Sequence, residues 1–169
     1  MKESILERRE DSAFETTLEL AQDIIKCYLS ARDALWKLGI LRSERMLQGD
    51  FAEWLVSKMF GLKLPDNTVQ AGFDAEDDSG KKYQIKSRIV PEALAHTAFD
   101  IADIDGDFDF LICVFFTESL ALRGVVQVSR DAVRELGSQT KKKFSFRWNR
   151  ETSQDPRITK LYWAATPND

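Results

Sequence analysis

The stretch that decides the fold is Gly72-Phe-Asp74-Ala-Glu76-Asp-Asp-Ser-Gly80-Lys-Lys-Tyr-Gln84-Ile-Lys86, residues 72–86. Its centre, Asp-Ser-Gly at 78–80, is typical of a three-residue hairpin loop in which Gly80 adopts the left-handed conformation. A loop of this length places Asp74 directly opposite Gln84 on the two strands that it joins. The stretch therefore predicts an antiparallel hairpin with a defined register.

The hairpin is expected to have one polar and one apolar face, because successive side chains of a strand point to opposite sides. The polar face contains Gly72, Asp74, Glu76, Lys82, Gln84 and Lys86. The apolar face, which a core needs, contains Phe73, Ala75, Tyr83 and Ile85. A carboxylate, an amide and an ammonium on one face could hold a divalent cation and a phosphate. An ordinary solvated strand gives the same alternation.

A helix is expected over 43–60, with Ser43 as its N-cap and Gly61 as its C-terminal stop. Its wide apolar arc is formed by Phe51, Ala52, Trp54, Leu55, Val56, Met59 and Phe60, and its narrow polar strip by Asp50, Glu53 and Ser57. We expect Glu53 to point toward Asp74, with Phe51, Leu55 and Met59 buried behind it. The alternative is that Glu53 is an ordinary exposed helix residue.

These residues resemble the PD-(D/E)XK nuclease superfamily, in particular its Mrr-like restriction-endonuclease branch. The matching pieces are Gly49-Asp-Phe-Ala-Glu53, Gly72-Phe-Asp74 and Gln84-Ile-Lys86. The family core is a helix, a three-stranded meander, a second helix and a further strand, and residues 43–116 can be arranged in that order, with a weak first strand within 62–70. The chain departs from most members by having Gln84 where they carry an acid, although glutamine is known at this place in the Mrr-like branch.

The resemblance implies a nuclease that hydrolyses phosphodiester bonds in DNA with Mg²⁺ or Mn²⁺, cations that prefer oxygen ligands. It implies that the metal is held by Glu53, Asp74, Gln84 and the backbone carbonyl of Ile85. The catalytic residues would be Asp74, Gln84, Lys86 and Glu53, with Lys86 orienting the attacking water or stabilising charge in the transition state. Because Gln84 is neutral, we expect weak metal binding and one metal rather than two.

The whole chain is expected to be one α/β domain with a restriction-endonuclease-like central mixed sheet flanked by helices. A long helix over 12–38, ended by Gly39, would form an N-terminal helical extension (1–42) for packing, dimerisation or DNA contact, beside a nuclease-like core (43–169). The other expected elements are a short helix at 92–100, strands at 108–116 and 120–128, a helix at 130–136 with Ser129 as N-cap, and extended segments at 142–148 and 158–163.

The charge balance argues against a general nucleic-acid binder, because 24 basic residues face 28 acidic ones and the net charge is −4. Residues 138–150 are an exception, with five cations and no acid. Their alternation directs Phe144, Phe146 and Trp148 toward a core and leaves a basic face, which could track phosphates or could be an ordinary solvated face. The residues predicted to contact nucleic acid are Lys82, Arg88, Lys141, Lys142, Lys143 and Arg147.

The two cysteines, Cys27 and Cys113, are expected to be buried reduced thiols of a cytoplasmic protein. With one histidine, His96, a zinc site is excluded by count, and that histidine is more often incidental than a catalytic base. No apolar run approaches the ~20 residues of a membrane helix, and the N-terminus lacks a signal-peptide core. No membrane partner is therefore expected.

Three functions are compatible with the sequence. The first is a magnesium-dependent endonuclease with DNA as its partner, in which a homodimer is an open alternative to a monomer. The second is a non-catalytic nucleic-acid- or protein-binding module on a nuclease-like scaffold. The third is a small regulatory protein that works through its acidic N-terminal helix. Glu53, Asp74 and Lys86 favour the first, whereas Gln84 and the acidic balance favour the others.

Overall fold

The structure, a computed structural model, describes residues 20, 23–24, 26–42, 47–66, 72–92 and 94–164. The chain divides into two compact units, Met1–Glu44 and Arg45–Asp169, and each is described by itself. In the first unit residues 26–37 are helical. The helix ends as predicted at Gly39, which has a φ of 71° and donates its backbone N–H to Trp36 O at 2.9 Å.

The beginning of that predicted helix, residues 12–19, lies outside the described residues. None of the helices in the described ranges has the length and apolar character needed to span a bilayer.

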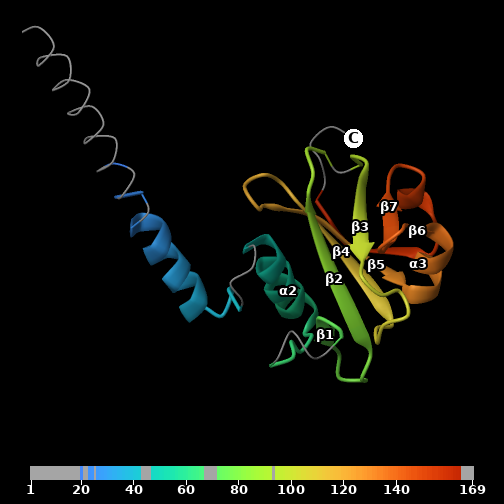
Figure 1. The fold of residues 1–169 in the computed structure, drawn as a ribbon, viewed down its shortest axis with the longest axis horizontal. Coiled ribbons are helices and arrows are strands. Elements are labelled where there is room, and N and C mark those ends of the chain that lie inside the picture. Colours follow the sequence, from blue (N-terminus) through green and yellow to red (C-terminus); the bar gives the residue numbers. More distant parts are fainter. Residues whose placement is uncertain are drawn as a thin grey trace, which may run out of the picture. The chain divides into compact units, whose positions relative to one another are not determined.

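The second unit is a mixed α/β fold, as predicted (Figure 1). Its elements are α2 (Leu47–Phe60), β1 (Ala75–Glu76), β2 (Lys82–Ile89), β3 (Thr97–Ile101), β4 (Phe110–Phe116), β5 (Leu122–Ser129), α3 (Arg130–Leu136), β6 (Ser138–Gln139), β7 (Phe144–Trp148), the 3₁₀ turn η1 (Thr152–Gln154) and β8 (Ile158–Trp163). A five-stranded sheet has the order β1-β2-β4-β5-β8 and a three-stranded sheet the order β3-β7-β6. Strands β2 and β4 are parallel, whereas the other pairs are antiparallel.

The two faces of the five-stranded sheet are covered by different layers. Helix α2 covers one face, where its Ala52 and Val56 belong to the same buried cluster as Tyr83 and Ile85 of β2. The three-stranded sheet and α3 cover the other face; the largest contributors to this cluster are Phe99, Phe115, Phe146 and Trp148. The prediction of a single central sheet flanked by helices is therefore right for the α2 face and wrong for the other, which is covered mainly by strands.

The predicted hairpin register is confirmed, since Ala75 pairs with Tyr83 and Glu76 with Lys82. Gly80 has a φ of 82°, as the loop type requires. The Asp77 carboxylate stabilises the loop by accepting bonds from Ser79 and the Lys81 backbone N–H, and also from Tyr83 Oη. These bonds, the one from the Ser79 hydroxyl first, lower the pKa of Asp77 to about 2.

The strand before this hairpin is reduced to one isolated bridge between Lys63 and Glu76, and residues 67–70 of the predicted 62–70 strand lie outside the described residues. Strand β1 is also shorter than predicted, because Asp74 comes directly before it. The outer edge of the five-stranded sheet is therefore short at β1.

Helix α2 ends as predicted at Gly61, which has a φ of 68°, while the predicted N-cap Ser43 lies outside the described residues. Two details of its faces were wrong. Asp50 and Ser57 are buried, whereas Met59 is 38% exposed. Because the apolar arc runs around most of the helix, residue type alone did not indicate which side meets the sheet.

Residues 97–101 form strand β3, so the predicted helix over 92–100 is wrong. Phe99 and Ile101 alternate into the core, and Phe99 pairs with Phe146 of β7. The partner strand is distant in sequence, so the local pattern did not reveal it. The predicted strands at 108–116, 120–128, 142–148 and 158–163 correspond to β4, β5, β7 and β8.

Two further local predictions had opposite outcomes. Ser129 caps α3 as predicted, and its hydroxyl accepts from Ala132 N at 3.3 Å. The expectation of two buried thiols holds for Cys113, whose pKa is raised by burial, and is wrong for Cys27, which is exposed.

Candidate metal and phosphate site

Asp74 lies at the outer edge of the five-stranded sheet, where the ladder between β1 and β2 ends. Its backbone N–H donates to Tyr83 O at 2.8 Å. Its carboxylate Oδ2 accepts from Ile85 N at 2.7 Å and from Gln84 Nε2. If β1 were longer, one of its backbone carbonyls would accept the N–H of Ile85. Here the Asp74 carboxylate accepts it instead. The structure brings Asp74 and Gln84 into contact, as the register predicted.

The backbone of Ile85 adds a second oxygen at this edge. In a strand, the N–H and C=O of one residue point to the same neighbour. Because Ile85 N donates to the Asp74 carboxylate, its carbonyl points to the Asp74 side of β2 as well. A carboxylate, a carbonyl and an amide side chain are therefore gathered around two consecutive residues of β2.

Lys86 shares a face of β2 with Gln84, since the two are separated by one residue. Gln84 pairs with Leu111 and Lys86 with Cys113 on the parallel strand β4, and both β4 residues are fully buried. Lys86 is half-buried, and within the described part of the chain its ammonium makes no hydrogen bond or ion pair. It therefore keeps its capacity to bind an external anion.

Glu53 is half-buried in the middle of α2. Its helix packs against the face of β2 that contains Tyr83 and Ile85, opposite to the face of Gln84 and Lys86. The structure does not place Glu53 on the polar face of β2. Its approach to Asp74, at the edge between the two faces, stays a prediction.

The described residues contain no group of three or more His, Cys, Asp or Glu side chains arranged to hold a metal ion. The predicted set has only two carboxylates, those of Asp74 and Glu53, and completes its ligands with an amide and a backbone carbonyl. A cation here would therefore depend on neutral oxygens to an unusual degree.

Two of the predicted nucleic-acid contacts are engaged within the protein. The Lys82 ammonium bonds to Asp107, which raises the pKa of the lysine, and lies 4.9 Å from the centre of the Phe73 ring. Arg88 donates from Nε to Ala98 O at 2.8 Å, and its Nη2 is 3.7 Å from Asp100. Both residues lie on the polar face of β2, but their cationic groups support the packing of neighbouring segments.

The other predicted contacts lie on the turn between β6 and β7 and on β7 itself. Lys141, Lys142 and Arg147 are exposed, while Lys143 bonds to Asp100, which also faces Arg88. Asp100 therefore connects the turn at 141–143, which we call the basic turn, to Arg88 of β2. Since the three-stranded sheet covers the Gln84 and Lys86 face, the turn and Lys86 lie on the same side of the five-stranded sheet.

The same strand confirms one prediction and corrects another. Phe144, Phe146 and Trp148 are buried, as their alternation predicted. Ser145, on the opposite face, is also buried, at 7% exposure. The outward face of β7 is therefore basic only at its ends and not a continuous solvated strip.

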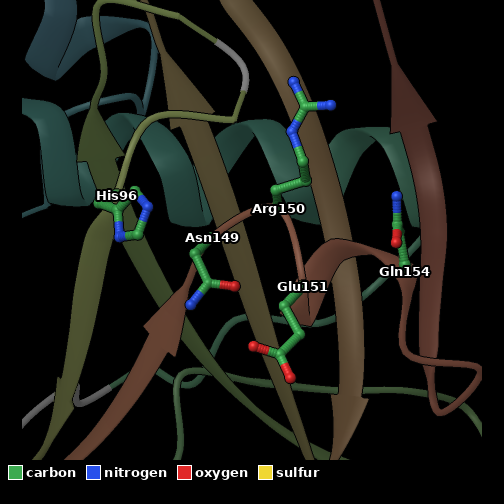
Figure 2. A pocket seen from close by; sticks show the side chains of 5 residues that line it. All are labelled: His96, Asn149, Arg150, Glu151 and Gln154. Carbon is green, nitrogen blue, oxygen red and sulfur yellow. The ribbon is translucent and has the colours of Figure 1, made fainter.

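A separate polar depression of about 400 Å³ is lined by His96, Asn149, Arg150, Glu151 and Gln154 (Figure 2). Among these residues His96 was considered from the sequence as a possible base, and Asn149 and Arg150 belong to the basic stretch 138–150. Arg150 and Glu151 carry opposite charges and point in opposite directions in Figure 2, and Asn149 Oδ1 is taken by Thr152. The lining side chains include both charges and do not point to a common centre, so they indicate no single class of ligand. We therefore place the candidate site at Asp74.

Comparison with known proteins adds no further assignment: a scan against protein-family models finds no match, and a search of curated proteins finds no similar sequence.

Proposed function

We propose that this chain is a cytoplasmic, metal-dependent nuclease that hydrolyses phosphodiester bonds in DNA. Its catalytic residues would be Asp74, Gln84 and Lys86, with Glu53 as a further carboxylate. The observation that carries the proposal is the contact of the Asp74 carboxylate with Gln84 and Ile85, beside an ammonium with no ion pair among the described residues. The resemblance of these residues to nucleases with a Glu, Asp, Gln-x-Lys set points to the same chemistry.

The donors fit a hard cation such as Mg²⁺ or Mn²⁺, because all of them are oxygens. Asp74 and the carbonyl of Ile85 would hold it, with Glu53 as the second carboxylate. Gln84 at present donates its amide N–H to Asp74, so its oxygen becomes a ligand only after the amide turns over. Both this rearrangement and the lack of a negative charge on Gln84 predict weak metal binding.

The protein residues have distinct tasks in this proposal. Asp74, which is positioned by the Ile85 N–H, would hold the cation. Lys86 would neutralise the charge that develops on the phosphate oxygens. It lies beside the buried Leu111 and Cys113 of β4, and a charge interaction in such apolar surroundings is stronger than in water. When bound, the metal supplies Lewis-acid polarisation and a nucleophile at neutral pH.

One observation favours the alternative of a non-catalytic nucleic-acid- or protein-binding module. The Gln84 amide satisfies the Asp74 carboxylate by a hydrogen bond, so this site is stable without a cation. In this alternative the basic turn would bind the partner, and Asp74 would serve only to end the hairpin ladder.

Calorimetric titration with Mg²⁺ and Mn²⁺, together with nicking of supercoiled plasmid and cleavage of labelled RNA, separates the two functions. Asp74→Asn keeps the size of the side chain and removes the charge, so metal binding and cleavage should disappear. Asp78→Asn, at an exposed position of the hairpin loop, is the matched control and should behave as wild type. RNA cleavage alone would correct the substrate.

Gln84→Glu is the second informative variant, because it restores the commoner family ligand and should tighten Mg²⁺ binding. If wild type neither binds metal nor cleaves, while Gln84→Glu gains both, the chain is a scaffold that lost its chemistry at one position. If no variant responds to metal or cleaves any substrate, the nuclease proposal is wrong.

A further inference from the structure

The helix of the first unit exposes large apolar side chains along one side. Leu20, Ile24, Tyr28 and Leu38 are 61, 61, 64 and 67% exposed. Ala31 and Leu35 fill the gaps between them. The separations of three and four residues place all six on the same side of an α-helix. We call these six residues the apolar stripe.

The opposite side of this helix carries both signs of charge, and it also exposes Leu29 and Trp36, at 48 and 40%. It contains Asp23, Lys26, Ser30, Asp33 and Lys37, and Lys26 pairs with Asp23 at 3.0 Å. A helix that binds anionic lipid or nucleic acid has a predominantly basic polar face instead. The charges named here balance, which favours a protein partner over lipid or nucleic acid, and the most exposed apolar residues belong to the apolar stripe.

The spacing of the apolar stripe identifies the kind of partner. From Ile24 to Leu38 the steps alternate between four and three residues, which is the 3.5-residue repeat of helices that pack side by side. A helix of this length is marginal in water without tertiary contacts. The partner is therefore expected to be another helix with the same repeat.

The apolar stripe is complementary to itself when two copies run in opposite directions. In that arrangement Ile24 faces Leu35 of the second copy, and Tyr28 faces Ala31, so in the central layers a large residue meets a smaller or matching one. In a parallel pair, Tyr28 would face Tyr28 and Ala31 would face Ala31, which crowds one layer and leaves a void in the next. We propose that two copies of this chain dimerise through an antiparallel pair of these helices. The proposal does not depend on the nuclease function.

Sedimentation equilibrium of the full chain over a micromolar concentration series tests the dimer with two adjacent substitutions. Ala31→Glu places a charge in the apolar stripe, and we expect it to raise the dimer dissociation constant at least about tenfold. Ser30→Glu introduces the same residue one position earlier on the polar side and should leave the dimer intact. Far-UV circular dichroism at a concentration where wild type is monomeric checks that both variants are equally helical.

Disulfide trapping tests the orientation in a Cys27→Ser background, where the remaining Cys113 is buried and unreactive. Chains with Tyr28→Cys mixed with chains with Ala31→Cys should give a disulfide-linked heterodimer on mild oxidation. Ala31→Cys chains alone should remain unlinked, whereas a parallel pair would link them.

A monomeric wild type at all concentrations would overturn the proposal, and so would a dimer that is equally stable in Ala31→Glu, since another surface would then hold it. Linking of Ala31→Cys chains to each other would overturn the antiparallel arrangement. Monomeric wild type that binds vesicles containing anionic lipid would assign the apolar stripe to a membrane surface instead.

Discussion

The two faces of strand β2 differ in burial and in polarity. Tyr83 and Ile85 are 8 and 5% exposed beneath α2, whereas Gln84 and Lys86, the alternate residues, stay half-buried on the other side. Strand β4, its parallel neighbour, is buried on both faces. Strand β2 lies next to the short edge strand β1, and its Gln84 face is only partly covered, so polar groups are accommodated there beside the buried Leu111 and Cys113 of β4. One strand thus serves both the core and the candidate site.

The largest expected effect belongs to the polar face. If Lys86 neutralises developing charge, Lys86→Ala should slow DNA cleavage by roughly 100- to 1000-fold. Its Mg²⁺ affinity should stay close to that of wild type, because an ammonium is not a ligand. Plasmid nicking rates at saturating metal give the first quantity and calorimetry the second.

Lys58→Ala, at an exposed position of α2, is the control for this prediction and should cleave at the wild-type rate. Equal rates for both variants would remove Lys86 from the catalytic residues and favour the binding-module alternative.

The next effect concerns stability and separates the two faces directly. Ile85→Ala removes a buried side chain of the α2 cluster and should lower the free energy of unfolding by about 2–5 kcal/mol. Gln84→Ala, one residue earlier, removes only one side-chain hydrogen bond and should cost roughly 1 kcal/mol. Urea denaturation measures both. Equal costs would mean that the Gln84 face is as important to the core as the Ile85 face.

A smaller effect is expected at the basic turn, which lies on the Lys86 side of the sheet. Replacing Lys141 and Lys142 by Glu should weaken DNA binding similarly for all sequences and lower the slope of log K against log salt by about 2. Lys143 is kept, because it bonds to Asp100. Fluorescence anisotropy between low and high salt measures the slope.

The control for the basic turn is a variant with Glu at Lys37 and Lys58, which has the same change in net charge at exposed positions elsewhere. If the two variants lose affinity equally, only overall charge matters and the turn is no contact surface.

The smallest effect is the pH dependence contributed by the hairpin loop. The pKa of Asp77 is lowered from 3.8 to about 2 in the folded chain, so its ionised form stabilises the fold above about pH 4. This contribution is lost as the pH falls through about 2. Asp77→Asn should therefore be less stable than wild type near neutral pH, and the difference should shrink between pH 4 and 2. Urea unfolding at several pH values measures it; a constant difference would contradict the linkage.

The sequence by itself determined the local features whose cause lies within a few residues. The Asp-Ser-Gly loop, with Gly80 at positive φ, defined the register that brings Asp74 to Gln84. Ser129 and Gly39 marked helix ends, because a cap requires only a nearby side chain or a permissive backbone. Alternation predicted the buried aromatic residues of β7, Phe144, Phe146 and Trp148, but not the burial of Ser145.

Only the tertiary structure decided how these pieces combine. Residues 97–101 became a strand because β7, distant in sequence, offered a pairing partner. Asp50 and Ser57 are buried and Met59 exposed because the position of α2 on the sheet, and not residue type, selects the buried side. The same packing placed Glu53 on the helix opposite to the Gln84 face and engaged Lys82 and Arg88 with Asp107 and Asp100. Packing between residues that are distant in sequence depends on the whole chain, so a local sequence pattern does not predict it.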